Sequence, residues 1–151
     1  MSLNAVGRPD LALREAIRLW DRSPSEELAV LGGKAALQSG RLAASLPKLE
    51  EALARYPTSE AIKTLVFLGL AFRVDDLLNR RALKEAARDL QQMRALKPDE
   101  CGPYSGLAKV ARLEGHDQEA RHLLAEAVRR DGGGACRQRA ASDPLLAPLV
   151  E

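Results

Sequence analysis

The chain has 151 residues, of which 46% are hydrophobic, 3% aromatic and 29% charged. Its 23 basic and 21 acidic groups give a formal net charge of +2, which is too balanced to favour nucleic acid or an anionic membrane as the main partner. The mostly apolar stretch 65–72 is far too short to span a bilayer, and the first ten residues lack the pattern of a signal peptide. These features predict a soluble cytoplasmic protein of one domain.

The cysteines and histidines give no signal for a metal or redox site. Cys101 and Cys136 lie far apart and form no CxxC pair, so we expect two reduced thiols rather than a disulfide or a zinc site. His116 and His122 lie six residues apart, on opposite sides of any helix that holds both. No catalytic dyad or triad signature is present, so we expect neither a cofactor nor a metal, and no enzymatic activity.

Helical spacing runs through the whole chain, and no segment alternates apolar and polar residues as a strand would. Short breaks separate the helical pieces, at residues 23–24, 40, 56–59, 97–99 and 115. In chain order the predicted helices cover about 10–22, 25–38, 41–55, 58–78, 80–96, 99–114 and 117–130. A final helical turn is expected within 142–149, after Ser142-Asp143-Pro144.

Small and bulky apolar residues recur at constant spacing along these helices. The clearest unit carries Tyr104, Leu107, Ala108, Gly115, Ala120, Leu124 and Ala127. The same frame fits Gly33, Gly40, Leu49, Ala52 and Pro57 in an earlier unit, and Leu68, Gly69, Ala86, Leu90 and Pro98 in a middle one. This pattern resembles that of the tetratricopeptide repeat family, whose unit has roughly 34 residues.

The resemblance implies an all-α fold, a right-handed superhelical stack of antiparallel helix pairs. It covers residues 10–131, as a lone helix 10–22 and hairpins at about 25–56, 58–96 and 99–131, followed by a capping segment 135–151. The middle unit is longer than the first, because Pro24 and Pro57 lie 33 residues apart whereas Pro57 and Pro98 lie 41 apart. The stretch 73–81 should absorb this surplus as a longer helix and a wider turn, either as a neutral insertion or as part of the binding face.

In this family the first helix of each hairpin lines a groove that holds a partner. The resemblance assigns nine groove residues here: Val30, Lys34, Leu37, Lys63, Val66, Leu70, Arg73, Lys109 and Arg112. Cations and aliphatics predominate in this set, which suits an acidic or amphipathic protein segment. The alternative is a set of ordinary solvated lysines and arginines. Some family members clamp a C-terminal carboxylate with Lys and Asn, but Leu70 occupies the place of that Asn.

These features favour a protein-interaction module, an adaptor or scaffold, and the Ala, Leu and Arg bias favours a bacterial source. The alternative function is a secretion- or assembly-type chaperone for one specific subunit. The lone first helix also leaves an open end that could pair with a second copy, giving a homodimer.

Overall fold

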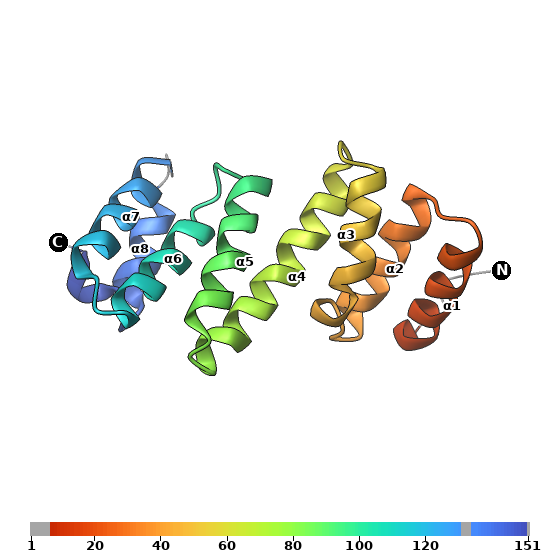
Figure 1. Ribbon diagram of the computed structural model, residues 1–151, viewed down its shortest axis with the longest axis horizontal. Coiled ribbons are helices and arrows are strands. Elements are labelled where there is room, and N and C mark those ends of the chain that lie inside the picture. The colour runs from red at the N-terminus through yellow and green to blue at the C-terminus, as the bar shows by residue number, and fades with distance from the viewer. Residues whose placement is uncertain (1–6, 131–133, 151) are drawn as a thin grey trace. The chain divides into compact units, whose positions relative to one another are not determined.

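The computed structural model describes residues 7–130 and 134–150, and within that part of the chain it is all-α, with no strand. The described residues form eight α-helices, labelled in Figure 1: α1 (Pro9–Arg22), α2 (Glu26–Gln38), α3 (Leu46–Arg55), α4 (Glu60–Asn79), α5 (Leu83–Leu96), α6 (Gly102–Leu113), α7 (Asp117–Arg130) and α8 (Ala135–Ser142). Two short 3-10 helices are added, η1 (Ala43–Ser45) and η2 (Ala147–Leu149). The prediction of an all-α, tetratricopeptide-like fold is confirmed. The predicted boundaries at residues 131 and 151 fall outside the described residues.

The chain divides into two compact units, Met1–Phe72 and Arg73–Glu151, and the division falls within α4. That helix has 20 residues, against 13 in α2 and 12 in α6, so the surplus of the middle repeat lengthens its first helix. Among the described residues, no helix combines the length and the apolar character that crossing a bilayer requires.

The first unit contains α1, α2, α3 and the greater part of α4. Ser25 begins α2 because its hydroxyl accepts a hydrogen bond from the backbone N–H of Leu28, 3.1 Å away. Gly33 allows close helix packing, since a Cβ at that position would lie 2.5 Å from Cδ1 of Leu65. Small residues at the recurring positions therefore let the helices of this unit approach closely.

The second unit contains the end of α4 and α5 to α8. An apolar cluster joins α6 and α7 to the segment that follows them, through Ala108, Ala111, Ala120, Leu124, Ala140 and Leu146. Helix α8 was not predicted, whereas η2 forms within the stretch where a final helical turn was expected. The segment 134–150 thus covers an apolar surface of α6 and α7.

The prediction of two reduced cysteines is wrong in this structure. Cys101 and Cys136 form a disulfide with a Cα–Cα distance of 6.0 Å, inside the range such bonds require. The bond forms because α8 folds back toward the start of α6, an arrangement that the sequence separation of 35 residues does not reveal. Cys136 is buried beside Tyr104 and Ala127.

Candidate partner-binding surfaces

Three of the nine predicted groove residues lie along one face of α2. Val30, Lys34 and Leu37 are spaced as i, i+4 and i+7, so they share a face of this helix. Lys34 is exposed and Leu37 is 39% exposed, while Val30 is partly buried. Lys34 has no hydrogen bond or ion pair within the described part of the chain. This α2 stripe (Val30, Lys34, Leu37) is an exposed cation between two aliphatic side chains.

On α4, the structure contradicts the expected exposure of Val66 and Leu70. Both side chains are fully buried, so neither is available to a partner. Lys63 remains partly exposed, and its ammonium lies 3.4 Å from the carboxylate of Glu60 on the same helix. The first part of α4 therefore offers one of its three predicted groove residues, and that one has an acidic neighbour.

The register of α4 explains this error. Gly69 of α4 packs against Leu46 of α3, and Gly106 of α6 packs against Leu90 of α5. The predicted repeat frame matched Gly69 to Ala108. Matching Gly69 to Gly106 instead moves the repeat frame on α4 by two residues. In the shifted frame the counterpart of Lys109 is Phe72 rather than Leu70. Phe72 is 52% exposed, and it was missed because Leu68-Gly69 also fits the family's Leu-small pair.

Arg73 is held by a buried acid within the second unit. Its Nε and one terminal nitrogen donate to the two carboxylate oxygens of Asp89 on α5, at 2.6 and 2.9 Å. The Asp89 side chain is only 7% exposed, so the guanidinium compensates a carboxylate that is removed from water. Arg73 therefore stabilises the pairing of α4 with α5 through Asp89.

The two predicted cations of α6 also have acidic partners. Lys109 lies 2.6 Å from Asp143, which follows α8, and Arg112 lies 2.6 Å from Asp117 at the start of α7. Partial burial opposes ionisation of Asp143. The hydrogen bond from Lys109 and the backbone N–H groups of Leu145 and Leu146 outweigh that effect and hold the pKa of Asp143 below its ordinary value. Lys109 thus anchors the C-terminal segment to α6.

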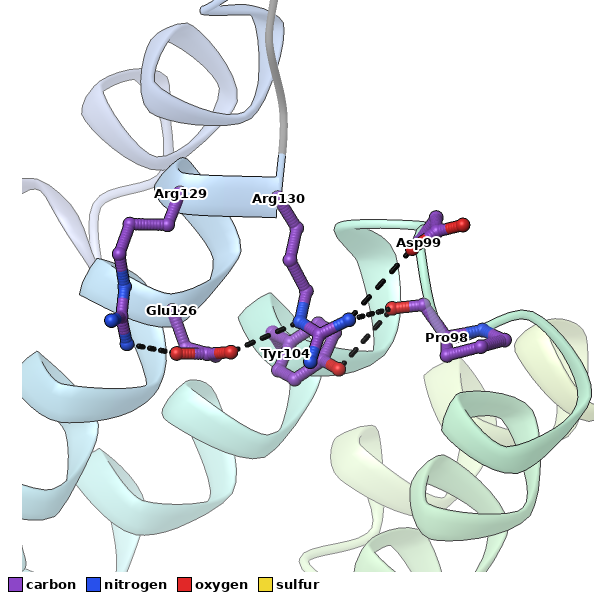
Figure 2. Close-up of polar contacts among 6 residues, drawn as sticks. All are labelled: Pro98, Asp99, Tyr104, Glu126, Arg129 and Arg130. Carbon is purple, nitrogen blue, oxygen red and sulfur yellow. Dashed lines mark hydrogen bonds and ion pairs between the residues drawn. The ribbon is translucent and has the colours of Figure 1, made fainter.

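Sequence reasoning missed a pocket of about 660 Å³ between α5 and α7, with Tyr104 of α6 at its wall. Figure 2 shows Arg130 reaching from the end of α7 toward the loop before α6. Its guanidinium donates to the carbonyl of Pro98 at 3.0 Å and to Glu126 at 3.0 Å, and lies 3.8 Å from Asp99. Arg129 also pairs with Glu126. These contacts fix the end of α7 against the α5–α6 loop.

Tyr104 is the residue around which this pocket is organised. Its hydroxyl donates to the same Pro98 carbonyl at 3.2 Å, and the residue is only 3% exposed. The guanidinium carbons of Arg94 and Arg130 lie 5.6 and 5.1 Å from the ring centroid, within cation–π range. The repeat pattern identified Tyr104 as a packing aromatic. It drew no attention to the arginines, because they belong to the second helix of each hairpin.

An apolar pocket of about 100 Å³ lies in the first unit, lined by residues of α1, α2 and α3. Ile17 of α1, which is 37% exposed, borders it together with Leu13 and Trp20. The pairing of this end with a second copy stays a prediction. Within residues 7–130 and 134–150, no three His, Cys, Asp or Glu side chains gather as metal ligands would.

No protein-family model and no curated protein matches the chain. Solved structures do match, among them the crystal structure of MamA, a tetratricopeptide-like helical protein. That comparison covers 95% of this chain and 85% of MamA, with a TM-score of 0.57 and 16% sequence identity. Identity at this level shows the fold alone. The chain therefore has a tetratricopeptide-like, all-α fold.

Proposed function

We propose that this chain is an adaptor or scaffold that holds a segment of a partner protein at the α2 stripe. The observation that carries the proposal is Lys34, an exposed cation without an intramolecular partner in the described residues, flanked by Val30 and Leu37. In tetratricopeptide-like folds this helix is the first of its hairpin. As part of the same proposal, the chain has no catalytic activity and is located in a bacterial cytoplasm.

The stripe suits an amphipathic segment that carries a carboxylate and an apolar side chain. A carboxylate would pair with Lys34, and an apolar group would cover Leu37. Such contacts contribute only a few kcal/mol, because burying one exposed leucine is worth about 1.5–3 kcal/mol at most. Further contacts are therefore needed. Lys63 of the same unit could exchange its exposed partner Glu60 for a carboxylate of the segment, since surface ion pairs are worth about 0–1 kcal/mol. Arg112 of the second unit could bind a carboxylate in the same way, in exchange for Asp117. Arg73 and Lys109 are expected to serve the fold instead.

Site-specific photo-crosslinking in the source organism tests this proposal. A photoreactive phenylalanine analogue replaces Leu37, and the matched control places it at Lys84, an exposed position on α5. We expect one defined protein adduct from position 37, lost when Lys34→Glu is added, with helicity unchanged by circular dichroism. Equal adducts from both positions, or none from position 37, would reject the α2 stripe.

A chaperone for one specific subunit is the second candidate. Leu37 and Phe72 of the first unit favour it, because they are 39% and 52% exposed and such a chaperone covers apolar segments of its client. Depletion of this chain distinguishes the two functions. A chaperone's crosslinked partner should aggregate or be degraded without it, whereas an adaptor's partner should stay soluble at the same level.

A further inference from the structure

The α5–α7 pocket carries an excess of positive charge. Its lining includes Arg94, Arg129 and Arg130 but a single acid, Glu126, so the formal charge of the lining is +2 when His122 is neutral. The charge is still +1 when Asp99, whose carboxylate lies 3.8 Å from Arg130, is counted as well. Both Arg129 and Arg130 already pair with that acid. The unbalanced charge therefore stands at a concave surface rather than on a convex, fully solvated helix face, and concave charge favours a bound anion.

Arg94 has unused hydrogen-bonding capacity. Its side chain is partly buried, and the ring face of Tyr104 is its only polar, charged or ring contact within residues 7–130 and 134–150. A guanidinium has five N–H donors in a planar fork. A carboxylate accepts hydrogen bonds from these donors, whereas a ring face does not replace such an acceptor. Arg94 thus lines the pocket with donors that are open to solvent and have no protein acceptor in the described part of the chain.

The neighbouring arginine is already fixed in place. Arg130 is held by the Pro98 carbonyl and by Glu126, and the hydroxyl of Tyr104 donates to the same carbonyl (Figure 2). Ordering a long side chain before binding lowers the entropy that is lost on binding. The pocket is therefore organised before a ligand arrives.

We infer that this pocket binds the carboxylate side chains of an acidic peptide segment. The arginine fork matches a carboxylate in two parallel hydrogen bonds, and Glu126 already binds Arg129 and Arg130 in the same place. Leu123, Ala95 and Pro98 provide apolar wall for the methylene groups of aspartate or glutamate. Glu126 and Asp99 beside Arg130 repel a compact dianion such as phosphate more strongly than carboxylates that are spread along a peptide.

This pocket is separate in sequence and structure from the α2 stripe, which lies in the other compact unit. The inference does not depend on the function proposed for that stripe. If both hold, a partner of this chain has two anchoring points, and the second of them requires acidic residues.

The test is a titration of the full, oxidised chain with a fluorescently labelled, acetylated and amidated tetraglutamate peptide, followed by fluorescence anisotropy. Inorganic phosphate serves as the competing anion. Arg94→Gln removes the guanidinium with unused donors. Arg88→Gln is the matched control, because Arg88 is an exposed arginine of the same helix outside the pocket lining. Arg94→Gln is also made in a Lys34→Glu background, so that any binding of the peptide at the α2 stripe does not contribute.

We expect Arg94→Gln to weaken peptide binding about tenfold, the loss of one or two charge-assisted hydrogen bonds, both in wild type and in the Lys34→Glu background, with Arg88→Gln close to wild type. Circular dichroism verifies that each variant is folded, and Arg129→Gln replaces Arg94→Gln if the latter does not fold. Equal losses in the Arg94 and Arg88 variants, displacement by equimolar phosphate, or no binding of the peptide by wild type would each overturn the inference.

Discussion

The three hairpin turns end their first helices in the same way but with different residues. Gly40, Arg81 and Gly115 have φ values of 71°, 59° and 83°, in the left-handed region. In each turn the next residue's N–H donates to a carbonyl five residues earlier, as in Arg41 to Ala36, at 2.8–2.9 Å. Two of these turns could be predicted from their glycines. The third could not, because arginine carries no signal for a positive φ.

Replacing Arg81 with Gly should therefore raise the free energy of unfolding by about 0.5–1 kcal/mol. The left-handed conformation costs a residue with a Cβ about 1–2 kcal/mol, and the greater flexibility of glycine in the unfolded chain offsets part of that gain. Urea denaturation measures the change. Lys84→Gly, on the exposed side of α5, is the control and should destabilise by about 0.5–1 kcal/mol. Destabilisation by both variants alike would contradict the turn argument.

The two arginines near the end of α4 should differ in their effect on stability. Arg73 compensates the buried Asp89, whereas Arg80 pairs with Asp76 at the surface, where both side chains are more than 60% exposed. We expect Arg73→Met to cost about 2–3 kcal/mol, below the range for fully buried pairs because Arg73 is 39% exposed. Arg80→Met should cost less than about 0.5 kcal/mol.

Chemical denaturation of both variants checks this difference. A double variant, Arg73→Met with Asp89→Leu, should recover most of the lost stability, since it leaves no buried charge without a partner. Equal effects of Arg73→Met and Arg80→Met would show that Asp89 is solvated in the folded chain.

At the scale of elements, the C-terminal segment depends on Asp143, which Lys109 contacts at 2.6 Å. The folded-state pKa of Asp143 lies below its ordinary value of 3.8, so the unfolded chain binds the proton more readily. Asp143 therefore stabilises the fold above that pH and loses this contribution as the pH falls through its lowered pKa. We expect the stability difference between wild type and Asp143→Asn to be present at pH 7 and to shrink as the pH falls below 3.8.

Urea midpoints of the two proteins at several pH values measure this difference. Asp76→Asn is the control, because Asp76 is an exposed acid of α4 that pairs only at the surface. A difference between wild type and the Asp143 variant that stays constant with pH would show that the carboxylate contributes through its shape alone.

The disulfide is a second link that holds the C-terminal segment, here through Cys136 of α8 and Cys101 just before α6. It closes a loop of 35 residues, for which the loss of unfolded-state entropy corresponds to about 4 kcal/mol. We expect dithiothreitol to lower the free energy of unfolding by about 2–4 kcal/mol in wild type and to leave a Cys101→Ser, Cys136→Ser variant unchanged. An equal response of both proteins would show that the thiols are not joined.

The redox state inside cells bears on the predicted location. Disulfides persist in oxidising compartments and are rare in the cytosol of mesophiles. Alkylation of thiols at the moment of lysis, followed by mass spectrometry of Cys101 and Cys136, shows which form is present. Alkylated cysteines fit the cytoplasmic location expected from the sequence, and a retained bond favours an oxidising compartment.

At the scale of the whole molecule, the helical hairpins could be predicted because their pattern is local. Spacing of apolar residues and the breaks at Gly40 and Gly115 are set within a few turns of chain. Contacts between residues distant in sequence determine the other features, namely the register of α4, the disulfide and the α5–α7 pocket. A degenerate repeat motif admits two frames on α4, and only packing of Gly69 against Leu46 distinguishes them.

The division within α4 raises the question of whether the chain unfolds as one cooperative unit. In helical-repeat folds the stability is a sum of the contributions of local interfaces. A cavity created in one unit should therefore destabilise mainly that unit. Leu46→Ala in the first unit and Leu90→Ala in the second both truncate fully buried leucines, at a cost of about 2–5 kcal/mol each. Hydrogen exchange should then show lost protection in α1–α3 for the first variant and in α5–α7 for the second. Uniform loss along the chain in both would mean that the continuous helix α4 couples the two units into a single cooperative structure.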